Sequence, residues 1–146
     1  MVVFGSIAAA APTQASGDEG SAVLNEINAT RAASGCGPVA PNPQLTASAA
    51  RHANDMLRTG VQAHTGSDGS SVVQRVTDAG YTSFEDLGEI VFWANGPGGS
   101  PAAAVNWWMN SPGHRAVITD CGMTDAGFSA VRSGSMLTVA GDFAKR

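Results

Sequence analysis

The 146-residue chain has few charged residues and no concentration of positive charge. Asp, Glu, Lys and Arg make up 14% of it, against roughly a quarter in an average globular protein. Eight Lys and Arg face twelve Asp and Glu, so the formal net charge is −4. The basic residues are scattered, whereas a surface that follows a phosphate backbone needs them grouped. We therefore expect no nucleic-acid partner.

Long hydrophobic runs are also missing. No segment approaches the ~20 consecutive apolar residues that cross a bilayer as a helix, so the sequence predicts no transmembrane segment. The apolar share of 43% nevertheless excludes a chain too polar to form a core. Without a repeat or a linker, a chain of this length predicts one domain that folds without a partner, and we favour a monomer.

The short motifs of common enzyme classes are absent as well. The sequence contains no HExxH zinc helix, no GxSxG nucleophile turn, no Walker loop and no GxGxxG dinucleotide loop. An enzymatic activity is therefore not predicted from motifs, and binding is favoured over catalysis.

Cysteine is scarce, with Cys36 and Cys121 as the two examples. Neither belongs to a CxxC pair, so a zinc site built on them is not expected. In an exported protein two cysteines indicate a bridge, whereas in a reducing compartment they remain thiols. We predict the bridge, because the N-terminal segment favours export.

Residues 1–15 are apolar and then rich in small residues, as in the later part of a secretory signal. The basic start of such a signal is missing. We predict that residues 1–17 are a signal-peptide remnant, the alternative being a disordered terminus, and that residues 18–146 form the single domain. The expected location is extracellular.

Apolar periodicity and turn residues predict helices first and a hairpin last. Asn42 before Pro43, and Ser100 before Pro101, are typical helix starts. Residues 132–135 separate two β-rich runs and predict a hairpin. Helices are expected over 21–34, 43–59, 71–79 and from 101 to near 112, and strands over 87–94, 124–131 and 136–143. The pattern predicts an α+β fold in which helices cover a small antiparallel sheet.

Three side chains could carry chemistry: His64 in a polar loop, Glu89 at the start of the apolar run LGEIVFW, and His114 after Ser111-Pro112-Gly113. A buried carboxylate needs a partner, although alternation also allows Glu89 to face solvent. Two imidazoles and a carboxylate can bind Zn²⁺, or can serve Ser111 as base and orienter. We expect a turn between Ser111 and His114. The spacing does not choose between these chemistries.

Trp107 and Trp108 are adjacent, so on a helix they point about 100° apart. One can then enter the core while the other reaches a groove. The alternative is that both are core or boundary aromatics.

Taken in order, these segments resemble one known family. The matching stretches are LNEINATRAASGCGPV, PQLTASAARHANDML, AHTGSDGSSVVQRVTDAGY, LGEIVFW, VNWWMNSPGHRAVI, and the closing pair DCGMTDAGFSAV and MLTVAGDFA. They resemble the CAP superfamily of cysteine-rich secretory proteins, antigen 5 and plant pathogenesis-related 1, in its bacterial secreted, SCP-like form. The resemblance covers about residues 21–144.

The resemblance implies a three-layer α-β-α sandwich with a small, mainly antiparallel central sheet, and a cleft where two His and two Glu meet. By position, His64 and His114 match the two His, and Glu89 matches one Glu. The second Glu falls near Ser111, and Ile90 replaces an Asn, so the family's four-residue cleft is incomplete. A bridge between the two cysteines fits disulfides of similar members.

Family members have been linked to metal binding, lipid binding and proteolysis, so the fold does not name a function. We expect a secreted binding module. Its cleft, formed by His64, Glu89, His114 and Trp108, would hold a divalent metal, with zinc on His64, His114 and Glu89, or a small ligand such as a lipid. The alternatives are a hydrolase, either metal-assisted or with Ser111 as nucleophile and His114 as base, and a disulfide-braced structural protein without a ligand.

Overall fold

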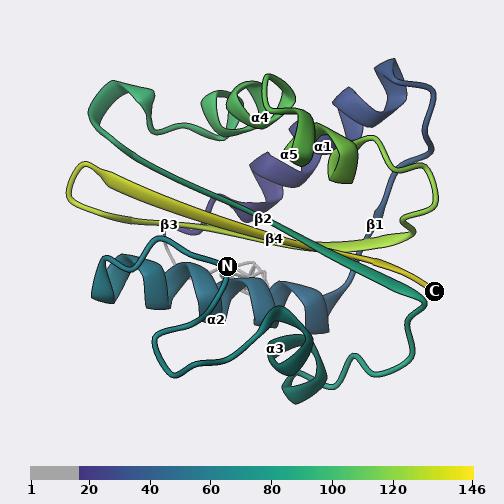
Figure 1. Cartoon of the computed structure of the whole chain (residues 1–146). Coiled ribbons are helices and arrows are strands. Elements are labelled where there is room, and N and C mark those ends of the chain that lie inside the picture. The colour runs from purple at the N-terminus through teal and green to yellow at the C-terminus, as the bar shows by residue number, and fades with distance from the viewer. Residues whose placement is uncertain (1–16) are drawn as a thin grey trace, which may run out of the picture.

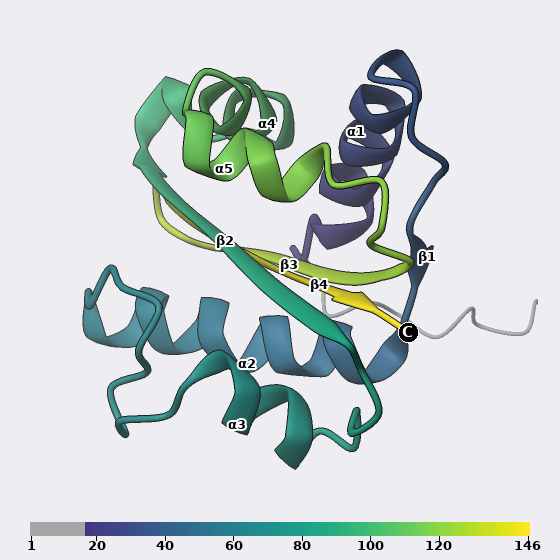
Figure 2. The same ribbon diagram turned by 45° about the vertical axis from the view of Figure 1, so that its right-hand side comes forward.

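A four-stranded sheet separates two layers of helices (Figures 1 and 2). This computed structural model describes residues 17–146, and the predicted signal remnant lies outside the described residues except for Gly17. The strand order is β1-β3-β4-β2, antiparallel throughout except for the parallel pair of β1 and β3. The strands are β1 (Ala40–Pro41), β2 (Asp86–Asn95), β3 (Asp125–Ser133) and β4 (Met136–Lys145).

Figure 2 shows the helices divided between the two faces of the sheet. One face is covered by α1 (Gly20–Ala33), α4 (Pro101–Met109) and α5 (Pro112–Ile118), and the other by α2 (Pro43–Thr59) and α3 (Val72–Asp78). A short 3-10 turn, η1 (Gly96–Gly98), follows β2. The predicted α+β fold with three layers is confirmed. Among residues 17–146, no helix is long and apolar enough to cross a membrane.

The predicted helix starts are confirmed by their capping bonds. The Asn42 side chain accepts hydrogen bonds from two backbone N–H groups of the first turn of α2, and Pro43 takes the first helical position. Ser71 caps α3 and Ser100 caps α4 in the same way. These local signals place the helices that carry or flank the site.

The two helix layers bury side chains on opposite faces of the sheet. The core on the α1, α4 and α5 side includes Ile27, Phe92, Trp108, Phe128 and Phe143, and the core on the α2 side includes Ala49, Ala53, Met56, Val91 and Ala140. Alternate residues of β2 therefore enter opposite cores, which leaves Glu89 on the α2 side with Val91.

Two short elements differ from prediction. The expected turn after Ser111 is wrong, because Pro112 opens the helix α5 with Ser111 at its N-cap position. Proline fits the first turn of a helix, where its missing N–H costs nothing. The strand β1 was not predicted, because two residues carry no periodic signal, and its pairing with β3 defines it.

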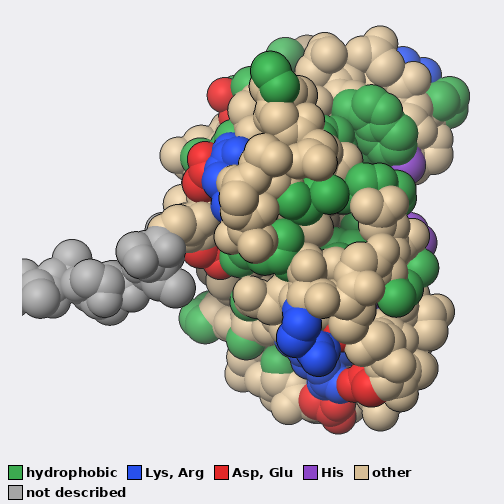
Figure 3. All heavy atoms as spheres, turned by 90° about the vertical axis from the view of Figure 1, so that its left-hand side faces the viewer, with side chains coloured by type: hydrophobic (Ala, Val, Ile, Leu, Met, Phe, Trp, Pro, Cys, Tyr) green, Lys and Arg blue, Asp and Glu red, His purple; other side chains and the backbone are tan. Residues whose placement is uncertain are grey.

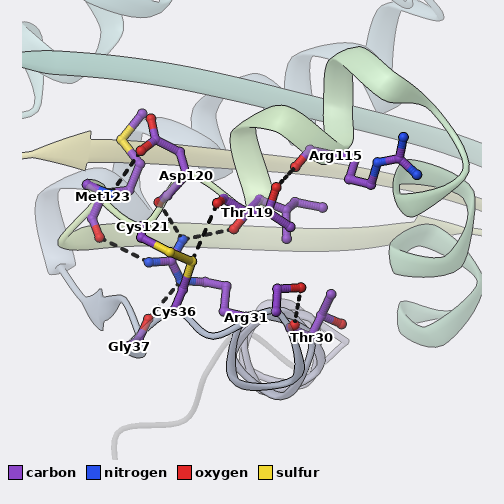
Figure 4. Close-up of a disulfide and its surroundings, with 12 residues drawn as sticks. Thr30, Arg31, Cys36, Gly37, Arg115, Thr119, Asp120, Cys121 and Met123 are labelled. Carbon is purple, nitrogen blue, oxygen red and sulfur yellow. Dashed lines mark hydrogen bonds between the residues drawn. A yellow bond between two sulfur atoms is a disulfide. The ribbon is translucent and has the colours of Figure 1, made fainter.

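The disulfide between Cys36 and Cys121 is confirmed (Figure 4). Beside it, the buried Arg31 donates hydrogen bonds to four backbone carbonyls, those of Gly37, Ile118, Asp120 and Met123. Bridge and guanidinium together fasten the end of α1 to the turn that follows α5.

Candidate ligand-binding site

Glu89 lies at the centre of the site, on the outer strand β2, and its side chain is only 2% exposed. Arg75 of α3 donates from Nη2 to Glu89 Oε2 at 2.8 Å, and His64 Nδ1 lies 3.0 Å from Oε1. Burial would raise the pKa of Glu89, but hydrogen bonds from His64 and Asp142 and the charge of Arg75 outweigh it and lower the pKa to about 2. Glu89 is a buried, charged carboxylate, so the alternative in which it faces solvent is excluded.

Asp142 lies directly opposite Glu89 on β4 and is fully buried. Within residues 17–146, no group donates a hydrogen bond to either of its carboxylate oxygens. Two adjacent buried carboxylates repel each other when both are charged. Burial, followed by the hydrogen bond and the charge of Glu89, raises the pKa of Asp142 well above its usual value. Burial thus favours the neutral, protonated form of Asp142 beside the charged Glu89.

His64 lies on the loop between α2 and α3, and its side chain is 58% exposed. The loop is fastened to α2 by His52, whose buried Nε2 donates to the carbonyl of Ala63 at 2.6 Å. Burial lowers the pKa of His52 and so favours its neutral ring, although the bond to Ala63 acts in the opposite direction. The hydrogen bond with Glu89 instead raises the pKa of His64, against the opposing effect of burial. The cationic form of the accessible His64 ring is therefore favoured.

His114 approaches from the opposite layer, in the first turn of α5. Its Nδ1 lies 2.7 Å from Ser111 Oγ, and its ring centre is 5.1 Å from the ring of Trp107. Burial, and then the nearby charge of His64, lowers the pKa of His114. The cleft thus pairs one imidazole whose cationic form is favoured with another whose neutral form is favoured.

An apolar pocket of about 340 Å³ adjoins these groups along β2. Trp93 and Trp107 are its exposed aromatics, at 38% and 51%. On the face shown in Figure 3, hydrophobic surface (green) lies beside histidine surface (purple). The predicted cleft residue Trp108 is instead fully buried, where its Nε1 donates to the carbonyl of Val91, so the assignment of Trp108 to the cleft is wrong and Trp107 takes that place. The pocket is lined by Val91, Phe92, Trp93, Ala94 and Trp107.

The predicted zinc ligands do not form a complete set. Among residues 17–146, no three His, Cys, Asp or Glu side chains are grouped to hold a metal ion. The oxygens of Glu89 are engaged by Arg75 and His64. A catalytic zinc takes three protein ligands, and the remaining nitrogens of His64 and His114 supply two. The three predicted residues therefore do not fit as direct ligands, and zinc binding stays a prediction.

The structure brings together His64, Glu89, Ser111 and His114, and adds three side chains that were not predicted: His52, Arg75 and Asp142. The sequence contains a recognisable pattern for two of these three residues. Arg75 shares a helix face with Val72, and Asp142 interrupts an apolar strand as Glu89 does. That both converge on Glu89 depends on the packing of α3 and β4 around β2.

The family is decided by a match over most of the chain. The model of the CAP, or cysteine-rich secretory protein, family matches residues 24–142. The chain belongs to this family. No curated protein sequence matches it.

Solved structures similar to this CAP domain agree on the fold. An extracellular SCP-domain protein of Bacillus anthracis is 20% identical, with a TM-score of 0.73 over 88% of this chain and 40% of its own. An outer surface protein of Borrelia burgdorferi is also 20% identical, with a TM-score of 0.76 over 86% of this chain and 91% of its own. NaASP2, in a structure with Zn²⁺, is 14% identical, with a TM-score of 0.53 over 84% and 75%. The chain thus spans less than half of the first of these proteins.

Proposed function

We propose that this CAP domain is an exported binding module whose cleft holds the anionic head of a small amphiphilic ligand, such as a fatty acid. The contact of 3.0 Å between His64 Nδ1 and Glu89 Oε1 carries the proposal. It raises the pKa of His64, whose ring is exposed, while Glu89 itself is buried. A ligand therefore meets the cation and not the carboxylate that maintains it.

The apolar pocket supports a ligand with a hydrophobic body. Its volume of about 340 Å³ lies within the range of roughly 300–1,000 Å³ that is usual for small-molecule sites. Trp107 contacts both this pocket and His114, so the polar and apolar parts of the cleft are continuous. An amphiphile would place its head at the two histidines and its tail along Trp93 and Trp107.

Export is supported by two independent observations. A disulfide persists in oxidising compartments and is rare in the cytosol. Similar structures belong to proteins described as extracellular or outer surface proteins.

The direct test is calorimetric titration with dodecanoate near pH 6. We expect binding that weakens at least tenfold in His64→Ala, because the cation that faces the carboxylate is removed. Arg58→Ala is the matched control, since it removes a 73% exposed cation that lies on α2. Absence of binding, or equal binding by both variants, would contradict the proposal.

Zinc is the competing occupant of the cleft, and the structure of NaASP2 with Zn²⁺ motivates a parallel titration. Imidazole binds metal only when it is neutral, so binding at pH 7 should vanish near pH 5. Stoichiometric binding that is lost in His64→Ala/His114→Ala would favour the metal over the amphiphile.

Hydrolysis is the second candidate function, and the distance of 2.7 Å between Ser111 Oγ and His114 Nδ1 favours it. The lowered pKa of His114 keeps that ring available as a base. Among residues 17–146, however, no carboxylate bonds to His114 to orient it. Hydrolysis of a p-nitrophenyl ester that Ser111→Ala abolishes would establish this function, and unchanged hydrolysis would exclude it.

A further inference from the structure

The outward-facing groups of β2 follow from its register with β4. The N–H of Gly96 donates to the carbonyl of Ser135 at 2.9 Å, in the same register as the pair Asn95 and Met136. Bonded and non-bonded pairs alternate in an antiparallel ladder. The even-numbered residues of β2 therefore bond to β4, and the odd-numbered ones turn N–H and C=O toward the outer edge. Those in the site are Glu89, Val91 and Trp93.

The opposite edge of the sheet, along β3, is closed by the chain itself. The carbonyl of Ala126 accepts from the N–H of Asn42, next to β1. Further along, the carbonyl of Ala130 accepts from the N–H of Glu19 at 2.8 Å, and its N–H donates to Asp18 Oδ1 at 3.0 Å. Backbone and side-chain groups of the chain thus bond to the outward groups of β3.

Residues 17–146 provide no comparable cover for the edge of β2. Trp108 Nε1 donates to the carbonyl of Val91 at 2.9 Å, and this is the one hydrogen bond that residues 17–146 make to the outward backbone groups of Glu89, Val91 and Trp93. Edge strands with free N–H and C=O groups are templates for another strand. A fatty-acid tail offers no donors or acceptors to these groups, whereas an extended peptide offers both.

We propose that the ligand of this cleft is an extended peptide that adds as an antiparallel strand to the outer edge of β2, with its C-terminal carboxylate at His64. The inference rests on the proposed function, because the ligand still has an anionic head and an apolar body. The head is now the C-terminal carboxylate of the peptide, and the apolar body is one of its side chains. The carboxylate meets the imidazolium held by Glu89, and the backbone meets Val91 N–H and the outward groups of Trp93.

The dimensions define the peptide. Glu89 and Trp93 are four residues apart, which is about 13 Å of strand, so four or five residues span the edge. A carboxylate at the Glu89 end makes the peptide run opposite to β2. Its more N-terminal part then passes the pocket of about 340 Å³ beside Trp93 and Trp107, which takes one apolar side chain.

The test uses the full chain and a synthetic pool of acetylated pentapeptides with free C-terminal carboxylates, randomised at every position. Retained peptides are identified by mass spectrometry, and the tightest is resynthesised with a C-terminal amide and with N-methyl groups on either alternate set of amides. We expect the amide to bind at least tenfold more weakly. Peptides methylated on one alternate set of amides should bind at least tenfold more weakly than the parent peptide. Those methylated on the other set should bind within threefold of it, because only every second N–H of an added strand faces β2.

Variants of the protein locate the binding surface. Trp107→Ala should weaken the parent peptide at least tenfold. Val73→Ala, which removes an equally exposed apolar side chain from α3, should leave binding unchanged. Both side chains are 51% exposed, so neither belongs to the buried core itself.

The outcomes separate this inference from the proposed function. If no peptide is retained, or if both N-methylated sets bind as the parent does, strand addition is overturned. If dodecanoate nevertheless binds in a His64-dependent manner, the proposed function stands without it. If neither dodecanoate nor any peptide binds, both fail.

Discussion

At the scale of single residues, Glu89 influences the protonation of groups on both sides of it. It accepts from His64 in the cleft and faces Asp142 inside the sheet. We expect Glu89→Gln to lower the pKa of His64, because the main cause of its raised value is removed. An NMR titration of the His64 ring protons measures this. The control is Glu85→Gln, a 70% exposed carboxylate, and an unchanged His64 pKa in Glu89→Gln would contradict the assignment.

The buried pair of carboxylates predicts opposite dependences of stability on pH. The pKa of Asp142 is raised on folding, so its contribution is complete below its unfolded pKa and is lost as pH rises through the folded value. The pKa of Glu89 is lowered to about 2, so its contribution is present above its unfolded pKa and is lost as pH falls toward 2.

Asp142→Asn tests the first of these dependences. The amide is uncharged at every pH, so we expect the free energy of unfolding to decline less between pH 5 and 9 than in the wild type. Asp142→Ala should be less stable across the whole range by about 1–3 kcal/mol, because Glu89 loses a buried hydrogen-bond partner. Urea unfolding at a series of pH values measures both. A decline in Asp142→Asn as steep as in the wild type would show that Asp142 does not hold the proton.

At the scale of elements, α2 packs so closely against β3 that position 127 has no space for a side chain, and Gly127 occupies it. A Cβ there would collide with the backbone of Leu45 and Thr46, which cannot rotate away. We expect Gly127→Ala to lower the free energy of unfolding by about 2–3 kcal/mol, as overpacking does. Gly98→Ala is the control, since nothing lies within 4 Å of its Cβ position. Equal urea midpoints for the two variants would contradict this packing.

At the scale of the whole molecule, the bridge between Cys36 and Cys121 joins points 85 residues apart in the chain. Closing such a loop restricts the unfolded chain and stabilises the fold by roughly 4–5 kcal/mol in the chain-entropy model. Cys36→Ser/Cys121→Ser should lose about this amount in urea unfolding, and reduction of the wild type should match it. A loss below about 1 kcal/mol would mean that the bonds of Arg31 already hold the two segments together.

The sequence predicted more of the fold than of the site. The helix starts at Asn42 and Ser100 and the closing hairpin were found because caps and turns act over a few residues. His64, Glu89 and His114 were predicted as site residues from the family resemblance, and Glu89 also because it is a carboxylate in an apolar strand. Trp108 was wrongly predicted to lie in the cleft. Helical geometry points two adjacent tryptophans in different directions but does not determine which of them faces the core.

By itself, the sequence determined the family, the order of helices and strands, and a single possible disulfide, because these depend on local patterns and on a cysteine count of two. The packing of the layers, in contrast, places Arg75 and Asp142 around Glu89, brings Trp107 to the cleft, and leaves the β2 edge uncovered by residues 17–146. These are contacts between segments far apart in the chain. They form when three layers pack together, and no local preference encodes them.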